Sequence, residues 1–318
     1  MHREYLPMNA AALMDRVFDI YKTTFLYQLA YTLVLGIVSS MLAVGVVFVF
    51  IIVGLIFTGI GGFTDDAAII VIVIIAFLIL LPFYMGWLYL SSSGHIFISK
   101  QAFYKEKLTL PFKEALQALL RVMSVGIAQF ILMIPPFILI AFIFFVVAIA
   151  AGFRGDLGML FIMHPIFLVV VSILFGLAFV AYSNIFALSV PVAIFEKRIF
   201  FSAITRSFQL LKEDFWRVLG LRILWFFIVF LFSYSAQGLL MSIFGIVTFI
   251  GGDTPTFIGL WTITSIIQFY SSLALTVIIA PMEGIMTALI YFNQKIKKDG
   301  LDIEIGLEQL ARAAVRRG

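Results

Sequence analysis

Long apolar runs alternate along the chain with shorter polar segments that carry most of its lysine and arginine. The apolar runs exceed the roughly 18 residues that identify a membrane-spanning helix. They lack the alternation of a β-barrel strand, and a helix satisfies its own backbone hydrogen bonds inside lipid, so we predict helical spans. The six predicted spans cover about residues 25–60, 68–92, 122–152, 160–194, 218–251 and 257–280.

Each predicted pair of spans follows a polar segment with the periodicity of an amphipathic helix. The most charged segment is Glu196 to Arg222, and similar segments occur at Ala12 to Phe25 and Gly94 to Arg121. The predicted fold class is therefore all-α, a single integral membrane domain of residues 1–318. Its six transmembrane helices form three hairpins, each preceded by a cytoplasmic amphipathic helix. Pro281 is predicted to break the last run, which leaves residues 281–318 as a cytoplasmic tail.

Lysine and arginine fall almost entirely on one side of this plan. Three precede the first span, five lie in Gly94 to Arg121, six in Glu196 to Arg222 and six after the sixth span. The other loops together hold only Arg154. The positive-inside rule makes the basic side cytoplasmic, so we expect both termini in the cytoplasm. We expect no cleaved signal peptide, because the first apolar run is far longer than the apolar region of one.

Two of the polar segments share a residue pattern. A middle segment, Ala115 to Met123, keeps the apolar rhythm but has neither the lysine nor the phenylalanine of that pattern. Either the chain contains three copies of one unit in a single orientation, or basic segments before hairpins have converged on similar residues. The residues that recur with identical spacing are Arg16, Phe18, Lys22 and Phe25 in the first segment and Arg206, Phe208, Lys212 and Phe215 in the last.

Composition excludes several functional classes. Hydrophobic residues make up 63% of the chain and charged residues 12%, against roughly half and a quarter in soluble domains. There is no cysteine, no phosphate-binding loop and no H-E-x-x-H motif, and the three histidines are isolated. We therefore predict no enzymatic activity, no cofactor and no metal. The net charge of +4 lies beside the spans, which indicates anionic lipid and not nucleic acid as the partner.

Two sets of polar residues are candidates for function. A carboxylate inside a bilayer is costly and is usually functional, although a break at Pro281 would place Glu283 at the interface instead. The other polar residues of the later spans either line a polar cavity or form ordinary hydrogen bonds between helices. The transport candidates are Glu283, Asn184, Gln237, Gln268 and Tyr270. The candidates for contact with lipid or a partner are Arg16, Lys22, Arg198, Arg206 and Lys212.

Three stretches of the chain resemble a bacterial family, the glycerophosphoryl diester phosphodiesterase membrane domain family. They are Met14 to Lys22, Ser202 to Trp216, and Leu289 to Lys295 continuing into Gly300 to Glu304. The resemblance implies an accessory component of the bacterial inner membrane. It does not imply the family's phosphodiesterase activity, because the chain has no segment for that soluble catalytic domain. Asn293 stands where we expect the family to favour aspartate.

Two functions are compatible with these patterns. The first is a non-enzymatic accessory or scaffold component of the bacterial envelope, whose basic cytoplasmic face contacts anionic lipid or a membrane protein such as a transport ATPase. The second is a small transporter or permease with a polar site between spans four to six and Glu283. The position of Glu283 distinguishes them, because transport predicts a carboxylate in a water-connected cavity between spans.

Overall fold

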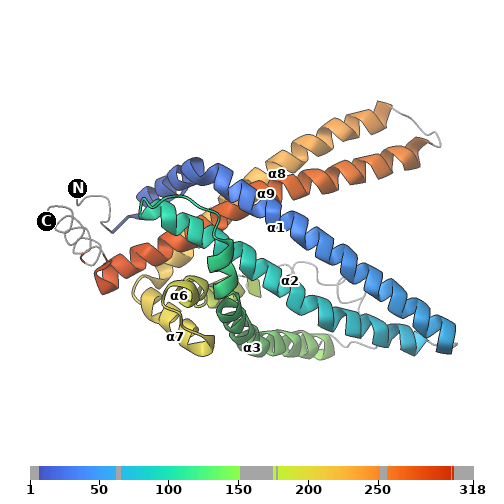
Figure 1. Ribbon diagram of the computed structural model, residues 1–318, viewed down its shortest axis with the longest axis horizontal. Helices are drawn as coiled ribbons and strands as arrows, with labels where there is room; N and C mark the ends of the chain where they lie inside the picture. Colours follow the sequence, from blue (N-terminus) through green and yellow to red (C-terminus); the bar gives the residue numbers. More distant parts are fainter. Residues whose placement is uncertain are drawn as a thin grey trace. The chain divides into compact units, whose positions relative to one another are not determined.

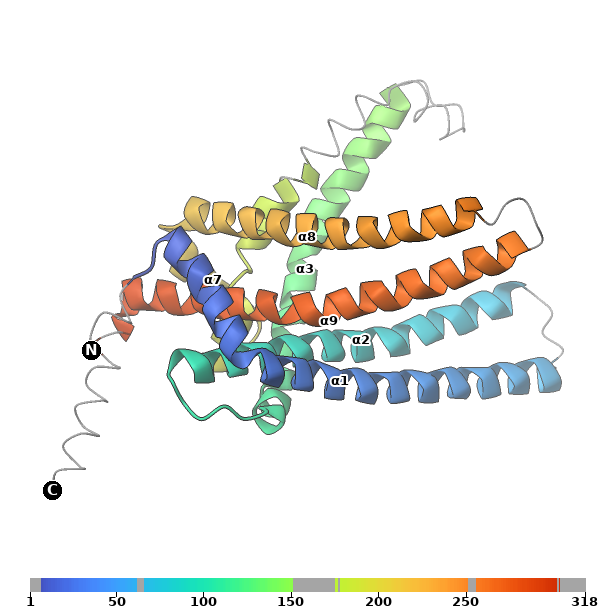
Figure 2. The same ribbon diagram turned by 90° about the horizontal axis from the view of Figure 1, so that it is seen from above.

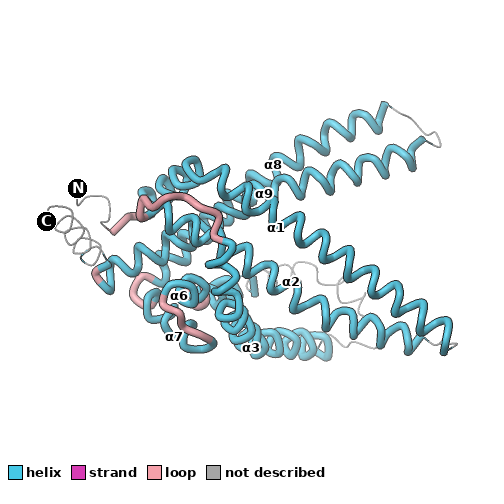
Figure 3. The backbone as a smooth tube through the Cα atoms, in the orientation of Figure 1, coloured by secondary structure: helices cyan, strands magenta, loops and turns pink. Residues whose placement is uncertain are grey.

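The protein is described here from a computed structural model, which describes residues 7–61, 66–150, 175–176, 178–250, 256–301 and 303. All secondary structure in these ranges is helical, and the tube drawing shows loops that join α2 to α3 and α6 to α7 (Figure 3). The fold is therefore all-α, as predicted. The labelled helices are α1 (Ala10–Gly61), α2 (Asp66–Phe103), α3 (Phe112–Ala150), α6 (Ser189–Phe195), α7 (Phe200–Leu211), α8 (Phe215–Ile250) and α9 (Thr256–Asp299).

Within the described ranges, five helical segments are long and apolar enough to cross a membrane. They indicate a polytopic helical membrane protein, in agreement with the predicted class. Some of the predicted features lie outside the described residues. They are much of the fourth span, 160–194, and most of the loops that follow the first, third and fifth spans. The five segments are Ala10–Met41, Phe112–Leu139, Ala178–Phe195, Phe215–Leu239 and Ser265–Asp299.

The chain divides into two compact units. The hairpin unit comprises Leu6–Leu119 and Gly220–Asn293, and the α7 unit comprises Met1–Tyr5, Leu120–Leu219 and Gln294–Gly318. Within the hairpin unit, α1 lies beside α2, and α8 lies beside α9, in both ribbon views (Figures 1 and 2). Each unit is described separately below.

The hairpin unit is packed around Tyr31, which is fully buried among Leu35, Ile98 and Ala115. Its ring lies against Gly94 of α2, where an added Cβ would be 2.0 Å from Tyr31 Cζ. Its hydroxyl donates a hydrogen bond to the carbonyl of Leu90 at 2.8 Å. Glycine is therefore required at position 94 because it lets the aromatic ring reach the backbone of α2.

The α7 unit is organised by the amphipathic helix α7. Its apolar side is buried, and the polar hydroxyl of Ser207 on that side donates to the carbonyl of Ile185 at 2.9 Å. The backbone before α7 turns sharply, with positive φ values at Lys197 and Phe200. The buried residues of α7 are Ala203, Ile204, Ser207, Leu210 and Leu211.

Two of the long helices continue past prolines, α3 past Pro135 and Pro136 and α9 past Pro281. Proline lacks an N–H, so it leaves the carbonyl four residues earlier without its helical partner. The carbonyl of Leu132, four residues before Pro136, instead accepts a hydrogen bond from Tyr182 Oη at 2.8 Å. A distant tyrosine therefore replaces the donor that Pro136 lacks.

The predicted break of the last run at Pro281 is wrong, because α9 runs from Thr256 to Asp299 across it. The hydroxyl of Tyr21 donates to the carbonyl of Ile278 at 2.9 Å, beside the carbonyl that this proline leaves without a helical donor. Residues 281–299 are consequently part of α9 and do not begin a separate segment.

We predict that Gly94→Ala lowers the thermal stability of the purified protein in detergent. The new methyl group would overlap the ring of Tyr31, and overpacking of this kind costs about 1–3 kcal/mol. Gly36→Ala in α1 is the matched control, because an added Cβ there meets no atom within 4 Å. Equal midpoints of thermal unfolding for the two variants would contradict the packing described here.

Candidate functional site

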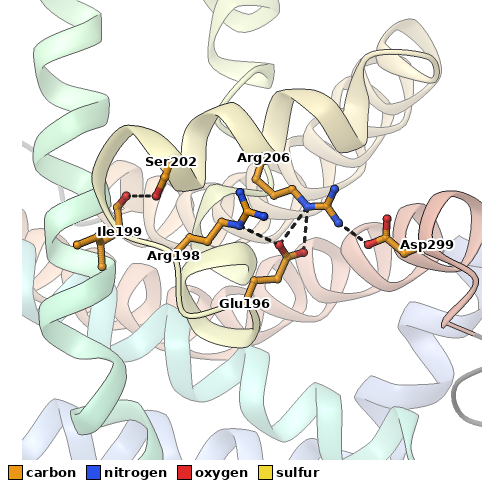
Figure 4. Close-up of polar contacts among 6 residues, drawn as sticks. All are labelled: Glu196, Arg198, Ile199, Ser202, Arg206 and Asp299. Carbon is orange, nitrogen blue, oxygen red and sulfur yellow. Dashed lines mark hydrogen bonds and ion pairs between the residues drawn. The ribbon is translucent and has the colours of Figure 1, made fainter.

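A network of charged side chains surrounds Arg206 in the α7 unit (Figure 4). Arg206 Nε donates to both carboxylate oxygens of Glu196, at 3.3 and 3.0 Å, and its Nη2 donates to Asp299. Arg198 approaches the same Glu196 carboxylate at 3.3 Å. The network therefore joins the residue after α6, the middle of α7 and the last residue of α9.

The charges of this network also determine the protonation of Arg206. Partial burial alone would lower the pKa of Arg206, but the hydrogen bond and charge of Glu196, together with those of Asp299, outweigh burial and raise it. The guanidinium is therefore a permanent cation that is already engaged by two carboxylates. This arrangement makes Arg206 a structural residue of the α7 unit, less available to lipid than the sequence suggested.

A second set of contacts joins the turn after α7 to the end of α9. The carboxylate of Asp214 accepts hydrogen bonds from Lys297 Nζ and from Gln294 Nε2. Burial would raise the pKa of Asp214, but the hydrogen bonds from Lys297 and Gln294 and the charges of Lys297 and Arg217 lower it overall. Lys298 forms an ion pair with Glu213 at 3.1 Å. Both acids that follow α7 are therefore neutralised by lysines of α9.

The other basic residues of the predicted contact face differ in exposure. Lys212 lies at the end of α7 and is exposed, and Lys22 is exposed on α1. Arg16 is partly buried on α1, and Arg198 is exposed although it is paired. The predicted face is therefore not uniform. Lys22 and Lys212 are the members with the most accessible charge.

Glu283 lies on α9 in the hairpin unit, and its side chain is exposed. Its carboxylate accepts a hydrogen bond from Trp225 Nε1 at 3.0 Å, and it interacts electrostatically with Arg222. An arginine on the neighbouring helix α8 thus supplies the counter-charge. The carboxylate is thus engaged by the buried Trp225 and by the charge of Arg222, as in a structural pair between neighbouring helices.

The remaining transport candidates belong to both units of the chain. Asn184 is fully buried in the α7 unit, where its Nδ2 donates to the carbonyl of Phe215 at 3.3 Å. Gln237 is partly exposed on α8, and Gln268 and Tyr270 are exposed on α9. Asn184 therefore supports the junction at the start of α8, as ordinary hydrogen bonding between helices requires.

Sequence reasoning missed a buried polar pair in the hairpin unit. His95 Nδ1 lies 2.5 Å from Gln28 Oε1, and both side chains are almost completely buried. His95 Nε2 lies 3.4 Å from the hydroxyls of Thr32 and Ser91. The signal in the sequence was weak, because His95 has no other histidine or acid at ligand spacing and Gln28 is far away along the chain.

Metal chemistry finds no support in the part of the chain that the structure describes, where no group of three or more His, Asp or Glu side chains is placed to hold an ion. No protein-family model, curated protein or solved structure matches the chain. The resemblance to the phosphodiesterase membrane domain family therefore stays a prediction.

One residue of that resemblance has a defined structural role. Asn293 Oδ1 accepts from the backbone N–H of Met8 at 2.7 Å, and its Nδ2 donates to the carbonyl of Met8 at 3.2 Å. The amide supplies both a donor and an acceptor, whereas an ionised aspartate accepts only, so an aspartate at position 293 would lose one of these bonds. Asn293 thus holds the segment before α1 against the end of α9.

We predict that Arg206→Gln destabilises the protein far more than Arg198→Gln does. Removal of Arg206 leaves Glu196 and Asp299 without their shared cation, and hydrogen bonds to charged groups contribute about 1.5–3 kcal/mol each. Partial exposure of the pair places the expected loss near the lower end of that range. Arg198 is more exposed, so its loss should change the free energy of unfolding by no more than about 0.5 kcal/mol. Denaturant titration in detergent measures both, and equal losses would contradict a structural role for Arg206.

Proposed function

We propose that the protein is a non-enzymatic accessory or scaffold component of the bacterial inner membrane. Its cytoplasmic face carries the surface that contacts anionic lipid or a membrane protein partner. The observation that supports this best is the way α7 is held. Ion pairs to Glu196, Asp299 and the lysines of α9 fix the helix, while Phe201, Phe208 and Lys212 on its outer side are exposed.

A surface held in this way suits binding better than catalysis. Among the described residues of the α7 unit, the carboxylates of Glu196, Glu213, Asp214 and Asp299 are engaged by arginine or lysine. None of these ion pairs places an acid beside a serine or histidine in the way that general acid–base chemistry requires. Aromatic side chains next to cations are typical of helices that lie at a membrane interface. The rigid fixation of α7 lowers the ordering cost of binding a lipid surface or a partner.

We also propose that six spans form three hairpins, each preceded by a cytoplasmic amphipathic helix. The burial of the first and last copies supports this plan. In the first copy, Leu13, Val17 and Ile20 are buried. Their counterparts in the last copy, found by matching Arg16 to Arg206, are Ala203, Ser207 and Leu210, and these are buried too. Gly94 matches Gly284 when Arg16 is matched to Arg206. At both glycines a neighbouring side chain lies too close for a Cβ atom to fit.

The transporter alternative receives less support. It depended on Glu283 within an enclosed polar site, but the Glu283 side chain is exposed and is engaged by Trp225. Gln268 and Tyr270, the candidates on the same helix, are exposed as well. We therefore place the accessory role first.

The proposed topology is tested by single-cysteine labelling, which is simple because the chain has no cysteine. We predict that Lys107→Cys, in the loop after α2, is blocked by a membrane-impermeant maleimide only after the cells are opened. Asp65→Cys, in a loop predicted to face outward, should be blocked in intact cells. Blocking of Lys107→Cys in intact cells would overturn the orientation.

The accessory role is tested by affinity purification of the full chain from its native membrane in mild detergent. We predict reproducible co-purification of a membrane-transport ATPase or an envelope enzyme. That partner should be lost in the double variant Phe201→Ser/Phe208→Ser and kept in Arg198→Gln. The double variant should retain the wild-type thermal midpoint, because both phenylalanines are exposed. Recovery of the chain alone, with thermal stabilisation by a small transported solute, would favour the transporter.

A further inference from the structure

The two matching copies of the residue pattern share exposed residues but differ in their buried residues. Phe18 and Lys22 recur as Phe208 and Lys212, and all four of these side chains are exposed. Arg16 recurs as Arg206, which is partly buried and held by Glu196 and Asp299. The buried positions differ, since the first copy has Leu13, Val17 and Ile20 where the last has Ala203, Ser207 and Leu210. A shared folding requirement would repeat the core residues. The similarity instead lies on the outer surface, which points to a binding requirement that occurs twice.

The repeated surface is a stripe of three side chains. On α1 it consists of Phe18, Lys22 and Leu26, spaced four residues apart and therefore on one helix face. Phe18 is 38% exposed and Leu26 is 74% exposed. We call this the first stripe.

The second stripe consists of Phe208, Lys212 and Trp216. Phe208 is 42% exposed on α7, and Trp216 is 77% exposed in the first turn of α8. Lys212 lies between them along the sequence, in the turn that separates the two helices, and is exposed like Lys22. In the sequence of each stripe, a lysine therefore stands between an aromatic residue and a second large apolar residue.

The neighbouring charges favour an anion at the second stripe. Glu213 and Asp214, which follow Lys212, are paired with Lys298 and Lys297 of α9. Those lysines offset the negative charge of the two acids. The positive charge of Lys212 therefore remains available to attract an anion. The first stripe is closer to neutral, because Asp15 and Asp19 are exposed beside it on α1.

We propose that each stripe binds the headgroup of an anionic phospholipid of the inner leaflet. The lysine contacts the lipid phosphate, and the flanking aromatic and apolar side chains lie at the boundary between headgroups and acyl chains. The inference rests on the cytoplasmic membrane face of the proposed function, but it does not require a protein partner. Helices that lie at the boundary between headgroups and acyl chains typically carry large apolar side chains beside lysine.

Lipid is the occupant that we propose, because both stripes lie at or within candidate spans. Trp216 lies at the start of Phe215–Leu239, and the first stripe lies within Ala10–Met41, two of the segments that are apolar and long enough to span.

The middle segment serves as an internal comparison. Leu116 and Leu120 of α3 have the same four-residue spacing as Phe18 and Lys22, and they are 62% and 79% exposed. No lysine stands between or directly after them in the four-residue spacing, and the cations of this segment, Lys113 and Arg121, lie outside the pair. We therefore expect a weaker preference for anionic headgroups here than at Lys212.

The test measures lipid selectivity of the full chain reconstituted in phosphatidylcholine vesicles that contain spin-labelled phosphatidylglycerol or spin-labelled phosphatidylcholine. The association of each labelled lipid is read from the motionally restricted fraction of its spectrum. Lys212→Gln should reduce the preference for phosphatidylglycerol at its site about fivefold, the loss expected for one cation near an anionic surface. Lys22→Gln should have a smaller effect, because the first stripe is nearer neutrality. Lys107→Gln, an exposed lysine outside both stripes, is the matched control and should leave selectivity unchanged.

A second measurement concerns the depth of Trp216. Its fluorescence, obtained as the difference between the wild type and Trp216→Phe, should be quenched most by lipids brominated near the headgroup. Equal loss of selectivity in Lys107→Gln and Lys212→Gln, or absence of quenching at Trp216, would overturn the proposal. Purification of the wild-type chain without any partner, with lipid selectivity intact, would instead count only against the accessory role, so the two ideas fail separately.

Discussion

The structure depends on one constraint, that backbone polar groups inside lipid must find partners within the protein. The helices meet it almost everywhere by themselves, and the prolines are the informative exceptions. Tyr182 donates to the carbonyl that Pro136 leaves free, and Tyr21 donates beside the one left by Pro281. Each tyrosine lies far from its proline along the chain. Helix continuity in this protein is therefore a tertiary property, because it depends on contacts between helices.

Those contacts explain which predictions from sequence succeeded. The apolar runs and their periodicity predicted an all-helical protein, and helix formation needs only local information. The continuation of α9 across Pro281 was not predictable, because it involves a hydroxyl from α1. The same holds for His95 and Gln28, which are ordinary residues in the sequence and become a buried pair only when α1 and α2 pack together.

The charged residues show the same division between local and distant information. Their number and spacing placed Arg206 on the polar side of an amphipathic helix. Its carboxylate partners were not visible in that pattern, because Asp299 belongs to the end of α9. Counting charges therefore predicted a contact face that includes α7. It did not separate the arginine that holds the helix from the lysine that points outward.

The pairing of α7 with the end of α9 also determines the order of assembly during synthesis. Lys297, Lys298 and Asp299 are made long after Glu213, Asp214 and Arg206. Before these residues are synthesised, Arg206 can pair only with Glu196. Glu213 and Asp214 then lack the lysines that pair with them in the complete structure. The ion pairs from the end of α9 are thus the last contacts of α7 that can form. A chain stalled before residue 297 would carry α7 without its anchor, in a state that quality-control proteases can distinguish from the finished protein.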